Sequence, residues 1–216
     1  MTRALTIDAA APPRRRGRPP KRVPRYGETR EALIRAGVAA LSEKGFSATG
    51  LDEILRGVGV PKGSFYHYFA SKDAFGAILI DAYATYFAGR LERAFRDDGT
   101  SPLRRLRGFV DEARAGMARH DFRRGCVVGN LGQEMGALPE HFRGQLRDVL
   151  GDWQARTARL LRAAQAAGEI GPHHDCERLA AFFWIGWEGA VLRAKLERDP
   201  APLDLFADGF FDLIGR

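Results

Sequence analysis

The sequence predicts an all-α fold with about nine helices, divided between a small N-terminal three-helix domain and a larger helical C-terminal domain. Beyond residue 27, apolar residues recur at intervals of three and four along most of the chain, which is typical of helices. Glycine, proline and helix-capping residues interrupt this pattern at intervals that suit helix ends. No segment shows the alternation of a convincing strand.

The first 26 residues carry the net charge of the chain. They hold eight basic residues and one acid, a net charge of +7, whereas the remainder is neutral overall. Five prolines and few large apolar groups indicate a segment that is disordered when free. Residues 14–19, Arg-Arg-Arg-Gly-Arg-Pro, are typical of arms that lie in the minor groove of A·T-rich DNA. A solubilising tail is the alternative interpretation.

Three short helices are expected next. The first covers residues 28–44 and ends at Gly45. Thr49 is expected to cap a second helix, which Gly59 closes, and Pro61 to begin a third that ends near Phe69. Three helices in about 45 residues, with a tight glycine turn between the last two, are typical of a helix-turn-helix. We therefore expect a basic arm at 1–26, a helix-turn-helix domain at 27–72 and a C-terminal domain at 73–216.

Six further helices are predicted in the C-terminal domain. Ser71 is expected to cap a helix over residues 72–96, which Asp98, Gly99 and Thr100 interrupt. Pro102 opens another that continues to residue 119. The remaining helices are expected at 126–136, 139–168, 175–198 and 202–214.

Residues 49–54, Thr-Gly-Leu-Asp-Glu-Ile, and 58–72, Val-Gly-Val-Pro-Lys-Gly-Ser-Phe-Tyr-His-Tyr-Phe-Ala-Ser-Lys, closely resemble the DNA-binding domain of the TetR family of repressors. The resemblance implies a homodimer whose third helix enters the major groove of double-stranded DNA at an inverted-repeat operator. It also implies a C-terminal domain that dimerises and binds a small-molecule inducer, which loosens the grip on DNA.

The residues of this motif suit contact with DNA. Gly63 permits a close backbone approach, and helix N-termini favour phosphate. Phe65 and Phe69 share one helical face and are expected to pack internally. For Tyr66 and His67, plain surface exposure is the alternative. The expected DNA-binding set is Arg15, Arg16, Arg18, Thr49, Lys62, Gly63, Ser64, Tyr66, His67 and Lys72.

The resemblance continues into the C-terminal half. Residues 122–139, Phe-Arg-Arg-Gly-Cys-Val-Val-Gly-Asn-Leu-Gly-Gln-Glu-Met-Gly-Ala-Leu-Pro, and residues 183–197 are very similar to acrylate-responsive repressors of the TetR family. Those repressors belong to acrylate and dimethylsulfoniopropionate catabolism. The similarity implies that acrylate or a close relative is the inducer. The chain also resembles a branch in which some regulators sense electrophiles through a cysteine.

Helical spacing independently gathers polar side chains in this half. Cys126, Asn130, Gln133 and Glu134 share one side of a predicted helix, and Trp184, Glu188, Val191 and Lys195 share one side of another. Buried polar groups should pair with each other or with a ligand. An acid such as acrylate needs a cationic site for its carboxylate and an apolar slot for its vinyl carbons. The expected effector-binding set is Tyr83, Phe87, Arg123, Cys126, Asn130, Glu134, Trp184, Trp187, Glu188 and Lys195. Core packing of the tryptophans and pairing of the glutamates with arginines are the alternatives.

Cys126 admits three interpretations. It begins its predicted helix after Arg123 and Arg124, where a thiolate would be a good nucleophile toward a Michael acceptor. It could instead be a redox sensor, or a small buried apolar residue. We favour reversible, non-covalent effector binding, because the acrylate anion is a poor electrophile.

Other classes of protein are disfavoured. There is no nucleophile–base pair or phosphate loop typical of an enzyme, and no cofactor is expected. The consecutive residues 173–176, His-His-Asp-Cys, do not easily converge on one metal ion. No apolar stretch approaches the roughly 18 residues of a membrane helix, and no secretory signal is evident. We expect a soluble, cytoplasmic protein that associates with the nucleoid when bound to DNA.

Overall fold

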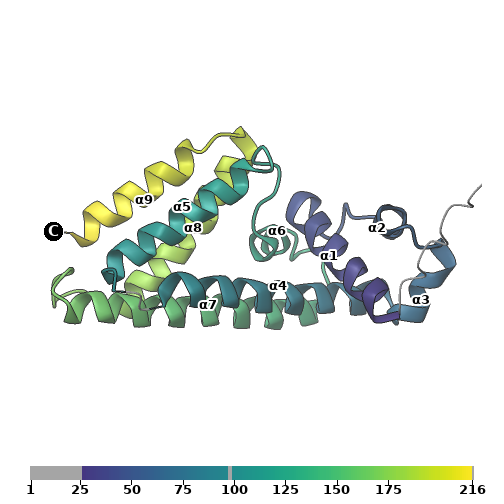
Figure 1. The fold of residues 1–216 in the computed structure, drawn as a ribbon, viewed down its shortest axis with the longest axis horizontal. Helices are drawn as coiled ribbons and strands as arrows, with labels where there is room; N and C mark the ends of the chain where they lie inside the picture. Colours follow the sequence, from purple (N-terminus) through teal and green to yellow (C-terminus); the bar gives the residue numbers. More distant parts are fainter. Residues whose placement is uncertain (1–25, 97–98, 216) are drawn as a thin grey trace, which may run out of the picture.

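A computed structural model describes residues 26–96 and 99–215 of the 216-residue chain. The DNA contacts predicted for Arg15, Arg16 and Arg18 lie outside the described residues. The described part contains nine α-helices, one 3-10 turn and no strand, which confirms the all-α prediction (Figure 1).

The N-terminal helices follow the predicted order. They are α1 (Tyr26–Lys44), α2 (Leu51–Val58), the 3-10 turn η1 (Lys62–Ser64) and α3 (Phe65–Tyr68). Gly45 and Gly59 end the first two helices with φ of 77° and 74°, a left-handed conformation that glycine adopts at little cost. The predicted Thr49 cap is wrong. Gly50 occupies the N-cap position of α2, and the Thr49 hydroxyl donates a hydrogen bond back to the Gly45 carbonyl.

The C-terminal helices are α4 (Lys72–Phe95), α5 (Pro102–Ala118), α6 (Val127–Gln133), α7 (Glu140–Ala166), α8 (Cys176–Glu197) and α9 (Ala201–Ile214). The predicted Ser71 cap is confirmed, because its hydroxyl accepts a hydrogen bond from the Ala74 amide at 3.0 Å. The predicted helix at 126–136 is too long. It begins at Val127, after Cys126 as N-cap, and ends at Gln133, after which Glu134 leaves the helical conformation.

The molecule is elongated (Figure 1). Helices α1, α2 and α3 lie at one end and α5, α8 and α9 toward the other, while α4 and α7 run side by side along much of its length. The short helix α6 lies between the two groups and contacts α1, α4 and α7. Helix α4 therefore connects the N-terminal helices directly to the C-terminal core.

Aromatic side chains dominate that core. Trp153 and Trp184 are almost fully buried, with ring centroids 4.9 Å apart, and Phe87 packs on Trp153 at 4.2 Å. The indole nitrogen of Trp184 donates to the Thr157 hydroxyl at 2.9 Å, which satisfies the only polar atom of its ring. Trp184 is thus a structural residue of the interface between α7 and α8.

Within the described ranges, none of the helices combines the length and apolar character needed to cross a bilayer. The same residues hold no cluster of three or more histidine, cysteine or acidic side chains that could bind a metal ion.

Candidate functional site

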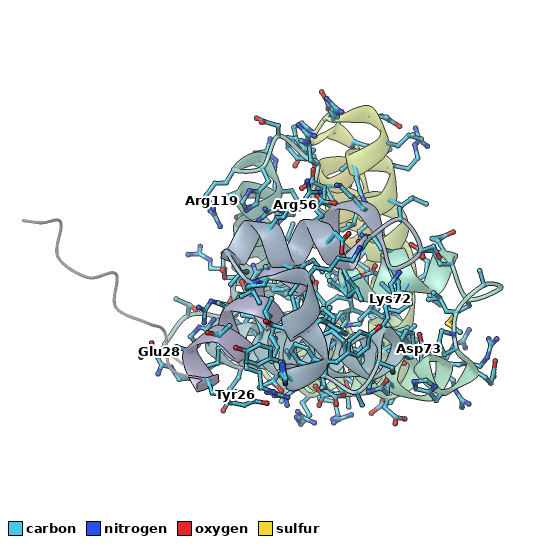
Figure 2. All side chains as sticks on the ribbon, turned by 90° about the vertical axis from the view of Figure 1, so that its right-hand side faces the viewer. Tyr26, Glu28, Arg56, Lys72, Asp73 and Arg119 are labelled. Carbon is cyan, nitrogen blue, oxygen red and sulfur yellow. The ribbon has the colours of Figure 1, made fainter. Side chains whose placement is uncertain are left out.

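The end of the molecule that carries η1 and α3 presents polar side chains outward; Figure 2 views this end. Tyr66 is 71 % exposed, and Lys62, Gly63 and His67 are exposed as well. No atom lies within 4 Å of the position that a Cβ would take on Gly63, so another molecule could approach its backbone closely. We call Lys62, Gly63, Tyr66 and His67 the recognition surface.

Buried packing holds the recognition surface in place. Phe65 and Phe69 are 2 % and 3 % exposed, as their spacing predicts. The first residue of α1, Tyr26, stacks on Tyr68 with 4.8 Å between ring centroids. Its hydroxyl donates to the His67 carbonyl at 2.9 Å. The short helix is therefore fixed on both sides although it has only one turn.

Three members of the expected DNA-binding set are less accessible. Thr49 is 3 % exposed, with its hydroxyl directed to the Gly45 carbonyl. The ammonium group of Lys72 lies 4.7 Å from the Phe46 ring centroid and 3.3 Å from the Phe46 carbonyl. Ser64 is half-buried. Thr49 and Lys72 thus stabilise the turn between α1 and α2 in this conformation.

A cavity of about 310 Å³ lies between α1, α4, α5 and α8; we call it the main cavity because it brings together the most residues of the expected effector-binding set. Aromatic and apolar side chains form its walls, namely Tyr83, Tyr86, Phe87, Met117, Trp187 and Val191. Its cationic and histidine lining residues are Arg35, Arg90, Arg119, His120 and Arg124. Of the expected effector-binding set it brings together Tyr83, Phe87, Cys126, Trp187 and Glu188.

A second cavity of about 210 Å³, the side cavity, lies between α6 and α8. It contains two further residues of the expected set, Asn130 and Lys195. Cys126, Glu188 and Val191 line both cavities and form the boundary between them. Seven of the ten expected effector residues therefore converge here.

The other three expected effector residues do not line these cavities. Trp184 is part of the core, as described above. Arg123 lies in a separate surface hollow and pairs with Glu43 at 3.4 Å. Glu134 follows Asn130 by one helical turn, but its carboxylate turns toward α1.

Arg90, a cationic residue of the main cavity, is absent from the set expected from the sequence. It follows Tyr83 by seven residues and Phe87 by three, so all three lie on one face of α4. The same helical spacing that relates Tyr83 to Phe87 leads to Arg90, and extending it by one turn would have found this residue.

Three ionisable groups meet at the boundary of the cavities. Burial raises the pKa of the Tyr83 hydroxyl and the pKa of the Cys126 thiol, and the neighbouring Glu188 carboxyl adds to both shifts. Burial beside an acid therefore favours the neutral thiol of Cys126 over the thiolate. The position at a helix N-terminus does not compensate, although the sulfur accepts the Gly129 amide at 3.5 Å.

Glu188 is the acid of this cluster. Burial raises its pKa from 4.5 to about 7. Its Oε2 atom is enclosed and has no hydrogen-bond partner among the described residues. Gly129 makes room for it, since a Cβ there would come within 2.2 Å of that oxygen. An enclosed carboxyl oxygen without a partner is characteristic of a site that binds a ligand or a proton.

The Glu188 carboxyl should make stability depend on pH. Since its pKa is higher in the folded chain than in the unfolded chain, its contribution to stability is greatest below pH 4.5. That contribution falls as the pH rises to 7, by about 3 kcal/mol in total. We expect Glu188→Gln to unfold at a higher temperature than wild type at pH 8, with a much smaller difference at pH 5. Thermal unfolding followed by circular dichroism would measure this, with the exposed Glu92→Gln as control. Parallel pH profiles for wild type and Glu188→Gln would contradict the assignment.

The boundary of the cavities is connected to the end of α1. The Asn130 amide group on α6 donates to the Leu41 and Ser42 carbonyls at 2.8 and 2.9 Å. The Gly125 amide also donates to the Ser42 carbonyl, at 2.9 Å. The Lys195 ammonium group lies 3.2 Å from the Asn130 side-chain oxygen and 3.5 Å from the Ser42 carbonyl.

One turn further along, Glu134 binds the turn between α1 and α2. Its carboxylate accepts the Phe46 and Ser47 amides at 3.1 and 2.8 Å. Gly45 leaves the space that this carboxylate needs, because a Cβ there would overlap with Glu134. We call the contacts of Asn130 and Glu134 with α1 and its following turn the α6–α1 junction. It joins the cavities to the helices that carry the recognition surface.

Comparison with known proteins decides the family. Residues 33–75 match the family described as bacterial regulatory proteins, tetR family, and residues 102–210 match the tetracyclin repressor-like C-terminal domain. The transcriptional regulator AcuR of Cereibacter sphaeroides is 59 % identical over 196 residues, which cover 91 % of this chain and 89 % of AcuR. The chain belongs to the TetR family. Its resemblance to that family and to AcuR, evident from the motifs, is confirmed.

Other members of the TetR family are similar to this chain over most of its length. The repressor NemR of Escherichia coli K12 is 30 % identical over 184 residues, covering 82 % of this chain and 89 % of NemR. A crystal structure of the regulatory protein TetR from Rhodobacter sphaeroides superposes with a TM-score of 0.84 at 59 % identity, covering 86 % of this chain and 98 % of that one. These relatives are transcriptional regulators, and TetR regulators bind DNA as dimers. The predicted DNA-binding regulator is therefore confirmed at the level of the family.

Proposed function

We propose that this TetR-family repressor controls genes of acrylate or dimethylsulfoniopropionate catabolism and leaves its operator when acrylate or a related small acid binds. The main support is a cavity that combines aromatic walls with arginines and touches α1, the first helix of the DNA-binding domain. Residues 122–139 and 183–197, which resemble acrylate-responsive repressors, contribute Cys126, Asn130, Trp187 and Glu188 to the two cavities. The chain acts by binding rather than by catalysis, in the cytoplasm on chromosomal DNA.

On DNA, the recognition surface enters the major groove and the basic arm lies in the minor groove through Arg15, Arg16 and Arg18. Residues 27–72 form the DNA-binding unit, and residues 73–216 bind the effector and the second subunit. Arg56, at the same end of the molecule in Figure 2, is an additional candidate for phosphate contact. Two-fold symmetry places the half-sites of the operator about 34 Å apart, or a multiple of this distance.

The dimer forms through exposed apolar side chains of α8 and α9. On α8 they recur at intervals of three, seven and four residues, which places them along one face of the helix. Large exposed apolar side chains that gather on one helix face are typical of a subunit interface. This α8–α9 face consists of Phe182, Ile185, Leu192 and Leu196 on α8 and Leu205 and Leu213 on α9. Since Ile185 and Leu192 also line the side cavity, the second subunit closes over that cavity.

Effector binding acts through the α6–α1 junction. A ligand at the boundary of the cavities favours a different position of α6, and α6 carries the turn between α1 and α2 with it through Glu134. The two recognition surfaces of the dimer then lose the separation that the operator requires. A difference of about 2 kcal/mol in effector binding between the two conformations lowers operator affinity roughly thirtyfold.

The test is a titration of the protein on its own upstream intergenic DNA, with and without acrylate. We expect acrylate to release the wild-type protein from DNA. It should release Cys126→Ser equally well, because the buried thiol does not react. Intact-mass measurement after acrylate treatment provides the control for covalent chemistry. Operator binding that no short carboxylic acid alters would refute the acid effector, and a stable adduct on Cys126 would refute non-covalent binding.

A second candidate function is an electrophile or redox sensor that acts through Cys126. It is favoured by the position of this cysteine on both cavities, with Lys195 on the same side cavity. This alternative predicts that oxidants release the operator from wild type but not from Cys126→Ser, and that acrylate has no effect.

A further inference from the structure

The two ends of the main cavity differ in chemical character. Tyr83, Cys126 and Glu188 provide hydroxyl, thiol and carboxyl groups at one end. Arg90 lies seven residues after Tyr83 on the same face of α4, about 10 Å further along the helix axis. Phe87 lies between them. The cavity therefore has an acidic end at Glu188, an aromatic middle and an arginine end, where Glu112 also lines the cavity beside Arg90.

Arg90 is the most enclosed arginine of the main cavity. Its side chain is 14 % exposed, compared with 37 % for Arg124 and 71 % for Arg35. Its guanidinium group lies 5.7 Å from the Phe87 ring centroid. One terminal nitrogen is 3.2 Å from a carboxylate oxygen of Glu112, whose side chain is 55 % exposed.

One donor of this guanidinium group is left without a partner. The Nε–H group of Arg90 is buried and donates no hydrogen bond to any described residue. A buried donor without an acceptor lowers stability, and the free-energy cost is larger when the donor belongs to a charged group than when it belongs to a neutral one. A carboxylate can bind Nε and a terminal nitrogen together, the arrangement that arginine favours with planar acids.

The acidic end repels an anion. Burying a second carboxylate beside Glu188 would place like charges together in a region of low polarity. The other cationic or histidine side chains that line the cavity are more open to solvent than Arg90: Arg35, Arg119 and His120 are exposed, and the Arg124 side chain is 37 % exposed. Lys195 is on the side cavity, where Asn130 engages it.

We propose that Arg90 binds the carboxylate of the effector through Nε and a terminal nitrogen, with the apolar end of the acid directed toward Cys126 and Glu188. This inference rests on the proposed function, and it specifies the ligand class as short monocarboxylates held from one end. The site selects the charge of its ligand at Arg90 and limits its length at the boundary with the side cavity.

The test compares acrylate with acrylamide, which has the same size and double bond but no charge. Affinities are measured by calorimetry on the full-length dimer, and operator release by fluorescence anisotropy. We expect Arg90→Gln to weaken acrylate binding by about 10- to 100-fold and to change acrylamide binding by less than about threefold. Arg90→Lys should recover part of the acrylate affinity, since it keeps the charge but not the paired donors. Arg93→Gln, which removes an exposed charge from α4 outside the two cavities, is the matched control and should leave both affinities unchanged.

Each result bears on the proposal. Undiminished acrylate affinity in Arg90→Gln overturns the role of Arg90 but leaves the acid effector standing. Equal losses for acrylate and acrylamide, with a lower unfolding temperature, show a structural role for Arg90 and also overturn the proposal. A wild-type dimer that binds its operator yet binds no short monocarboxylate refutes the proposed function itself.

Discussion

Replacing Lys62 and Tyr66 together by alanine is expected to abolish operator binding while the chain remains folded. Both side chains project from the recognition surface, with Lys62 80 % and Tyr66 71 % exposed. The ion pair of Lys62 with Asp52 is exposed and contributes little to stability, so Lys62 is free to bind phosphate. Contacts of this kind each contribute about 1–3 kcal/mol, and each is made twice in a dimer. We expect affinity to fall by at least 100-fold, measured by gel shift on the protein's own promoter.

The control for this variant is Arg104→Ala, which removes an exposed basic residue from α5. It should bind the operator like wild type. Thermal unfolding should be unchanged for both proteins, because none of the three side chains is buried. Operator affinity that survives the double substitution would remove α3 from the DNA interface.

Introducing charge into the α8–α9 face should lower operator affinity about as much as the double substitution of Lys62 and Tyr66. Ile185 and Leu205 are 72 % and 78 % exposed, so Ile185→Glu with Leu205→Glu adds four carboxylates to a symmetric interface without disturbing the core. We expect a dimer in the wild type and a monomer in this variant at micromolar concentration, measured by analytical ultracentrifugation. Operator affinity should fall at least 100-fold, since the two half-sites would then be bound independently.

Arg147→Glu on α7 reverses an exposed charge away from this face and is the matched control. It should remain dimeric and bind DNA normally. A variant with both glutamates that still dimerises would show that another surface joins the subunits. A monomer that retains full operator affinity would contradict the need for two copies.

Local features of the fold could be predicted because single residues determine them. Gly45, Gly59 and Ser71 mark helix ends through backbone conformation or side-chain capping, and each acts within a few residues of its position. The same local reasoning failed at Thr49, where a hydrogen bond to Gly45 competes with capping of α2. Periodicity likewise assigned Phe65 and Phe69 to the interior.

The candidate site could be predicted only in part, because its geometry depends on contacts between distant segments. Helical spacing identifies a face but not the partner of that face. It grouped Trp184 with Glu188, yet Trp184 packs on α7 while Glu188 reaches the cavities. It grouped Glu134 with Asn130, but Glu134 binds amides 87 and 88 residues earlier in the chain. The raised pKa of Cys126 likewise comes from burial and from Glu188 on another helix.

The carbonyl group of Ser42 has a consequence for how the signal is transmitted. Donors from the segment before α6, from α6 itself and from α8 converge on this single oxygen atom, through Gly125, Asn130 and Lys195. Because all three donors share one acceptor, a small rotation of α1 that breaks one of these hydrogen bonds also weakens the other two. Intermediate tilts of α1 are thus disfavoured, and each subunit should respond in an all-or-none manner to rising inducer concentration, with partial induction reflecting a mixture of two populations.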